Sequence, residues 1–249
     1  MKLNPTALIS GLAAAGAIAA SGMTAQAASF TARDAEAAAC ANQQVCVVND
    51  FFTLTAGNDM YLTHKSFEGF YGLGIAENPD PNLQWKDDPS WGEIDSNGEF
   101  LRVDLAVTKA LRSIDLNFLY QPGVNSDRVF EVAEITATLL DGSFLTHTLT
   151  VTGDTSASWS GTGSVVNVSP STAGGGGWYS ILNPFGDLEV ASLSFAAVRV
   201  NDSLTRQSWD SDYTLKGIAT VPEPATVLGL VGVAALAGFG VRRRQNSEQ

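Results

Sequence analysis

Leu101-Arg102-Val103-Asp104-Leu105-Ala106-Val107-Thr108 is the run that decides the fold class of this chain. Its large apolar residues take every second position, which is the period of a strand with one buried face. Ile114–Tyr120 repeats the alternation, and no strand–helix–strand rhythm typical of a parallel sheet appears. Further strand-like runs lie at Val165–Val168, Trp178–Leu182, Leu188–Val200 and Tyr213–Ala219. The pattern predicts an all-β chain, a single antiparallel β-sandwich that is jelly-roll-like.

A hairpin is predicted in the middle of the chain. Glu131–Leu140 and Ser143–Thr152 flank Asp141-Gly142, a dipeptide that favours a two-residue type I′ turn with positive φ at both positions. On the return strand, His147 shares one face with leucine and valine, and threonines occupy the other. A lone histidine on an apolar strand face is typical of a core residue.

The first part of this domain carries two further signals. The alanine-rich segment Ser29–Ala41 predicts a short helix, and Val45–Thr55 predicts the first strand. Cys40 and Cys46 are the only cysteines, and in an exported protein we expect them to form a disulfide that pins this strand. Zinc is not expected, because two cysteines without a nearby histidine leave its tetrahedral shell half empty.

Charge restricts the partners of the domain. Residues 28–221 carry 10 Lys and Arg against 24 Asp and Glu, a net charge of −14. This balance argues against nucleic acid, which needs clustered basic residues, and disfavours anionic lipid. Divalent cations, neutral glycans and solubility outside the cell are all compatible with it.

The end of the chain has three parts in a fixed order. Pro222-Glu223-Pro224 precedes the uncharged, apolar run Ala225–Val241, and Arg242, Arg243 and Arg244 follow it. As a helix this run reaches about 25 Å, near the short limit for crossing a bilayer. The arginines are expected to stay on the cytoplasmic side. An ordinary resident membrane anchor behind a proline-rich stalk is the alternative.

These residues, 222–249, resemble the PEP-CTERM sorting signal, which the membrane-embedded transpeptidase exosortase recognises. The resemblance implies that Pro222, Glu223 and Pro224 are the recognition residues and that 225–241 is a transient transmembrane helix. It implies Arg242–Arg244 as the stop, exosortase as a partner, and delivery from a membrane-anchored precursor to the cell surface or extracellular matrix. The membrane would then be contacted only through this C-terminal helix.

The beginning of the chain predicts export. Lys2 precedes the apolar run Ala7–Ala20, and Ala25-Gln26-Ala27 places small residues at the −3 and −1 positions of a cleavage site. We expect a signal peptide over 1–27, removed by signal peptidase after secretion, with Ala28 as the neighbouring alternative site. A buried helix is the competing interpretation. The β-sandwich domain is therefore expected over 28–221.

Catalytic patterns are weak, and no enzyme is expected. Glu131 and Glu134 are close in sequence, but three residues apart on a strand they point to opposite faces. Glu93, Asp95 and Glu99 share a side only if their segment is extended, and Ser96-Asn97-Gly98 between them indicates a turn. Glycoside hydrolysis requires two converging carboxyls, so the sequence names no catalytic residue.

Two ligand predictions remain. Acidic loops suit calcium, and Asp202, Asp210 and Asp212 are its predicted ligands, although they do not match the EF-hand pattern. Solvated acidic turns are the alternative, and for any single cluster they are the simpler explanation. Trp85 and Trp91 flank an acidic loop and are predicted to stack on sugar rings, the alternative being that they plug the end of the sandwich.

Together these patterns predict an exported, exosortase-processed protein of the cell surface or extracellular polysaccharide matrix. Its β-sandwich is expected to be structural, adhesive or glycan-binding, with calcium as the one cofactor considered. A polysaccharide-modifying hydrolase or lyase on the same fold is the alternative, and a passive coat protein is a third interpretation.

Overall fold

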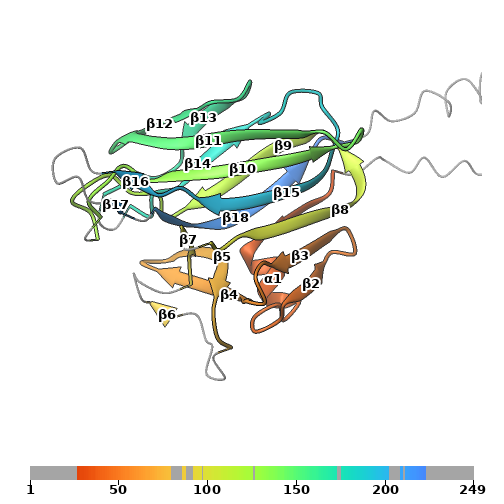
Figure 1. Ribbon diagram of the computed structural model, residues 1–249, viewed down its shortest axis with the longest axis horizontal. Coiled ribbons are helices and arrows are strands. Elements are labelled where there is room, and N and C mark those ends of the chain that lie inside the picture. The colour runs from red at the N-terminus through yellow and green to blue at the C-terminus, as the bar shows by residue number, and fades with distance from the viewer. Residues whose placement is uncertain are drawn as a thin grey trace, which may run out of the picture. The chain divides into compact units, whose positions relative to one another are not determined.

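Two β-sheets packed face to face form the protein in a computed structural model, shown in Figure 1. The structure describes residues 27–79, 86–87, 92–96, 98–125, 127–172, 175–201, 208–209 and 211–222. Ala27–Pro222 form one compact unit. No helix among these described residues is long and apolar enough to cross a membrane, and the predicted span 225–241 lies outside them, as do residues 1–26.

The larger sheet has nine strands, and its centre is β18. Its path is β13 (Ser164–Asn167), β14 (Tyr179–Leu182), β9 (Leu111–Asn117), β18 (Asp212–Thr220), β5 (Phe70–Ala76), β4 (Tyr61–Phe67) and β6 (Lys86–Asp87). The short strands β1 (Ser29–Thr31) and β7 (Ile94–Asp95) also pair with β18. Pairing is antiparallel except between β4 and β6.

The second sheet has seven antiparallel strands. Their order is β12 (Ser156–Trp159), β11 (Phe144–Gly153), β10 (Val132–Leu139), β15 (Val190–Ala197), β8 (Leu101–Lys109), β3 (Phe52–Ala56) and β2 (Val45–Val48). A separate two-stranded ribbon joins β16 (Val200–Asn201) to β17 (Ser208–Trp209).

The core lies between the two sheets. Alternate residues of both sheets point inward and are fully buried, among them Leu54, Leu101, Val103, Phe195, Leu73, Ile114, Leu116, Ile181 and Leu215. The period-two pattern of the sequence therefore marks the inward faces, because successive side chains of a strand point to opposite sides. The prediction of an all-β sandwich is confirmed, and the jelly-roll connectivity stays a prediction.

The β10–β11 hairpin forms as predicted, but its turn does not. The Leu139 N–H donates to the Ser143 C=O at 2.8 Å, and the Gly142 N–H donates to the Leu139 C=O at 3.0 Å. Gly142 has φ +83°, whereas Asp141 has no positive φ. The predicted type I′ turn is wrong: the loop has three residues, and such loops need a left-handed residue only at the last one.

The N-terminal segment contains more and shorter elements than predicted. Ser29–Thr31 is strand β1, so the helix α1 is confined to Ala32–Ala37, with Thr31 as its N-cap in a capping box with Asp34. The predicted strand 45–55 is a hairpin of β2 and β3. Asn49 and Asp50 both have φ +53°, and the Phe51 N–H donates to the Val48 C=O. The type I′ geometry expected at the later hairpin therefore occurs here.

Candidate functional site

Four acidic side chains gather around one buried lysine, and we call them the carboxylate cluster: Glu93, Asp127, Glu131 and Asp212. Lys65 projects from β4, and its Nζ lies 2.8 Å from Glu93 Oε2, with both side chains buried. The lysine also lies 5.0 Å from the centre of the Phe118 ring. One cation is thus enclosed among four acids, so negative charge is in excess.

Backbone groups hold Glu131 at the centre of the cluster. The Tyr120 N–H donates to Oε2, and the Asp212 N–H donates to Oε1 at 3.4 Å. The carboxyl oxygens of Glu131 and Asp212 lie within 4.8 Å of one another. Two carboxylates this close repel one another, which favours the protonated form of either group.

Burial raises the pKa of every acid in the cluster. Loss of hydration and the nearby Asp212 raise the pKa of Glu93 and Glu131 well above the usual range, although Lys65 opposes the effect at Glu93. Burial likewise raises the pKa of Asp127 to about 7, and it raises the pKa of Asp212. Each of these carboxyls therefore takes up a proton more readily than a solvated carboxyl does.

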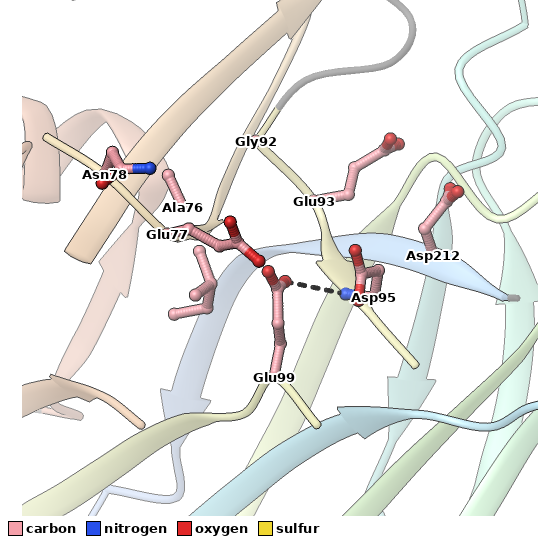
Figure 2. A pocket seen from close by; sticks show the side chains of 9 residues that line it. Ala76, Glu77, Asn78, Gly92, Glu93, Asp95, Glu99 and Asp212 are labelled. Atoms are coloured by element: carbon pink, nitrogen blue, oxygen red, sulfur yellow. Dashed lines mark hydrogen bonds between the residues drawn. The ribbon is translucent and has the colours of Figure 1, made fainter. Parts of the chain in front are cut away.

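A pocket opens beside the cluster, with a volume of about 360 Å³ (Figure 2). Its acidic lining is Glu77, Glu93, Asp95, Glu99 and Asp212. The Asp95 N–H donates to Glu99 Oε2 at 3.0 Å, and Figure 2 shows Glu77 and Glu99 pointing toward one another. Burial, the largest effect, raises the pKa of Glu99 to about 7.

This geometry suits a divalent cation. Asp127, Glu131 and Asp212 each offer a carboxylate oxygen, and these oxygens lie within 4.8 Å of one another. Calcium binds six to eight oxygens at 2.3–2.6 Å, so three converging carboxylates supply about half a shell. A cation would also reduce the repulsion between these acids. A sugar, by contrast, has no direct access to Glu131, which is fully buried.

The predicted site residues have different outcomes. Asp212 lies in the cluster, whereas its predicted partners Asp202 and Asp210 lie outside the described residues, as do Trp85 and Trp91. The structure instead places Asp127 and Glu131 beside Asp212, so the described metal candidate has different ligands from those predicted.

The turn predicted between Asp95 and Glu99 is present, since Ser96 and Gly98 are turn residues and Gly98 has φ +90°. We expected this turn to separate the acids, but it folds Glu99 back onto the Asp95 N–H and places both in one pocket. Lys65 and Asp127 were missed altogether. The only signal in the sequence was a lysine inside the strand-like run Tyr61–Phe67, which by itself indicates little.

The remaining candidates are structural. Cys40 and Cys46 form the predicted disulfide, which joins the residues after α1 to β2. His147 packs against Trp159 and Phe185, with ring centres 5.4 and 5.8 Å away. His64 is buried in β4, and burial lowers its pKa to about 4, so it is neutral at pH 7.

Trp159 and Trp178 are partly buried and hydrogen-bonded within the domain. Trp159 Nε1 donates to the Pro184 C=O at 3.1 Å, and Trp178 Nε1 donates to Asp115 at 3.4 Å beneath the Lys216 ammonium. These contacts are typical of residues that pack within a domain.

The fold and the carboxylate cluster define an all-β domain with an acidic site. A sequence motif at the end of the chain indicates where the protein is sorted. Residues 220–244 match the family model of the PEP-CTERM protein-sorting motif, so the chain carries that motif. The motif indicates an exported protein with exosortase as its processing partner and a membrane-anchored precursor sorted to the surface. No curated protein and no solved structure matches the chain.

Proposed function

We propose that the mature β-sandwich is a structural or adhesive, non-catalytic component of the cell surface or of the extracellular polysaccharide matrix. The observation that carries the proposal is the position of the sorting motif: its match begins at residue 220, the last residue of β18. Processing near Pro222-Glu223-Pro224 would therefore release the complete domain with almost no linker. Contact with polysaccharide through Trp85 and Trp91 is part of the same proposal.

The test of this function is the intact mass of the protein from its native host, in separate membrane and extracellular fractions. We expect an extracellular species that begins near Ala28 and ends near Pro222. A protein that retains residues 225–249 in the membrane fraction would be a resident anchor, and the proposal would then be wrong.

We further propose that calcium stabilises this domain at Asp127, Glu131 and Asp212. The support is the excess of buried carboxyls over the single Lys65, because a divalent cation relieves both the repulsion and the need for protons. Extracellular calcium-binding modules work with weak sites of 10⁻⁴ to 10⁻³ M, which tolerate an incomplete protein shell.

Thermal unfolding with calcium or with EDTA tests the ion. At a hundredfold excess over Kd, binding contributes about 2.7 kcal/mol, which is roughly 5–10 °C for a domain of this size. Asp127→Asn should lose most of this increase, whereas Glu134→Gln, the same loss of charge on β10 outside the cluster, should keep it. A wild-type protein whose Tm does not respond to calcium would refute the site.

A hydrolase or lyase is the second candidate, and one observation favours it. Glu93, Glu99 and Asp212 converge on a single pocket, and the pKa of Glu99, about 7, suits a general acid at neutral pH. Incubation with the host's extracellular polysaccharide should then release reducing ends or unsaturated products, and Glu99→Gln should abolish the release. Equal release by the variant would exclude this role for Glu99.

A further inference from the structure

The chain enters and leaves the domain at the same end of the sandwich. The Ala28 N–H donates to Thr220 Oγ1 at 2.9 Å, and the Thr220 N–H donates to the Ala28 C=O at 2.8 Å. One residue later, the Val221 N–H donates to the Ala110 C=O at 2.9 Å, in the connection between β8 and β9. The first and last residues of the domain are therefore held together, and we call this end of the sandwich the exit pole.

The tip of the β10–β11 hairpin lies at the same pole. Lys109, the last residue of β8, pairs with Val190, which in turn pairs with Leu139. The Leu140 N–H donates to the Glu189 C=O at 3.1 Å. In Figure 1 the end of β8 and the loop that joins β10 to β11 accordingly lie together on the right of the sandwich.

Large apolar side chains are exposed at this pole. Leu140 is 66% exposed and Phe144 is 71% exposed, the two highest values among the large hydrophobic residues of the described chain. Val107, Leu182, Leu188 and Val221 are also exposed there. These positions belong to β8, the β10–β11 hairpin, the end of β14, the connection from β14 to β15 and the residue after β18, so the fold gathers on one end side chains that are far apart in the sequence.

The length of the chain beyond the pole limits its distance from the membrane. Only Pro222, Glu223 and Pro224 separate Val221 from the apolar run that begins at Ala225. Four Cα steps of extended chain span at most about 14 Å. The headgroup layer on each side of a bilayer is about 5–8 Å thick. In a membrane-anchored precursor, the exit pole thus faces the lipid surface at short range.

We propose that the exit pole docks on the membrane in the precursor, with Phe144 and Leu140 inserted at the boundary between headgroups and acyl chains. The proposal rests on the membrane anchor that the sorting motif indicates. Charge does not drive the contact, because Lys109 and Arg112 at this pole are outnumbered by Asp141, Asp187 and Glu189. Burial of apolar surface drives it, so neutral phosphatidylcholine suffices as the partner.

The test uses the full-length precursor in phosphatidylcholine vesicles, with an environment-sensitive fluorophore on a single added cysteine. Ser143→Cys places the label at the hairpin tip, and Thr155→Cys places it beyond the far end of β11, about 30 Å away at 3.3 Å per residue. Cys40 and Cys46 are bridged, so only the added thiol reacts. We expect doxyl lipids to quench the label at 143 at least threefold more strongly than the label at 155, with the reverse order for aqueous iodide.

Substitution of the two inserted side chains completes the test. Phe144→Ser with Leu140→Ser should lower lipid quenching at 143 at least threefold, while Val45→Ser, an exposed valine on β2, should leave it unchanged. Both replaced side chains are exposed, so thermal unfolding should show that the variant still folds.

Three outcomes would overturn the proposal, and they are distinguishable. A precursor that floats with the vesicles but shows equal quenching at both positions refutes the docking alone. One that does not float refutes the membrane anchor and the docking with it. Shielding of position 143 without vesicles, increasing with protein concentration, would assign the pole to a second copy of the chain.

Discussion

Replacing Glu99 by glutamine should stabilise the protein at pH 8 and leave its stability nearly unchanged at pH 4. Burial raises the pKa of this carboxyl from 4.5 to about 7 in the folded state. Between these values the folded protein holds a proton that the unfolded chain has released. The contribution of Glu99 to the unfolding free energy is therefore complete below pH 4.5 and is lost as the pH rises to 7.

The magnitude follows from the two pKa values. At about 1.4 kcal/mol for each factor of ten in proton affinity, the loss due to Glu99 is about 3 kcal/mol. Glutamine has no proton to lose and still offers an oxygen to the Asp95 N–H, the bond that Glu99 accepts at 3.0 Å. We expect the variant to exceed the wild type at pH 8 by about 3 kcal/mol, roughly 6–12 °C in Tm.

Thermal unfolding of both proteins in EDTA, at half-unit steps from pH 4 to pH 8, measures this difference. Glu134→Gln is the control, since it removes one carboxylate from the outer face of β10 and should give the wild-type curve. Parallel curves for wild type and Glu99→Gln, with no gain at pH 8, would refute the assignment of Glu99 as a buried acid.

Three other outcomes are expected. Replacing Cys40 and Cys46 together by serine should lower the unfolding free energy by about 2 kcal/mol in a denaturant titration, because the closed loop is short; an unchanged midpoint would contradict this. Gly142→Ala should cost about 1 kcal/mol in the same titration although no atom obstructs the new methyl group, because φ is +83° there; a neutral result would mean that the turn changes its geometry. Alanines at Pro222, Glu223 and Pro224 should leave unprocessed precursor in the membrane fraction by intact mass, and normal release would refute recognition of these residues.

The strands were predictable where one face of the strand is buried and the other is not, because the residues then alternate between apolar and polar. Leu101–Thr108 alternates because β8 has one face in the core, and that property is visible within eight residues. The turns were less predictable. Asp141-Gly142 suits a type I′ turn locally, but the pairing of Thr138 with Phe144 sets a longer connection, in which Gly142 alone takes the left-handed position.

The carboxylate cluster and Lys65 could not be predicted together, because four separate segments of the chain supply them. Lys65 comes from β4, Glu93 precedes β7, Asp127 and Glu131 lie between β9 and β10, and Asp212 begins β18. Their meeting depends on β18 pairing with both β5 and β7, which is a long-range choice of strand order. The order of the strands in the sheet cannot be inferred from the positions of acidic residues along the chain.

The amino-acid sequence by itself determined the sorting motif, the disulfide and the all-β class. Each is a local property: a contiguous peptide is recognised, two cysteines lie six positions apart, and strands alternate with period two. Only the tertiary structure decided which acids surround Lys65, and only it placed Ala28 beside Thr220. Sheet pairing joins residues 192 positions apart, and no local pattern encodes such a contact.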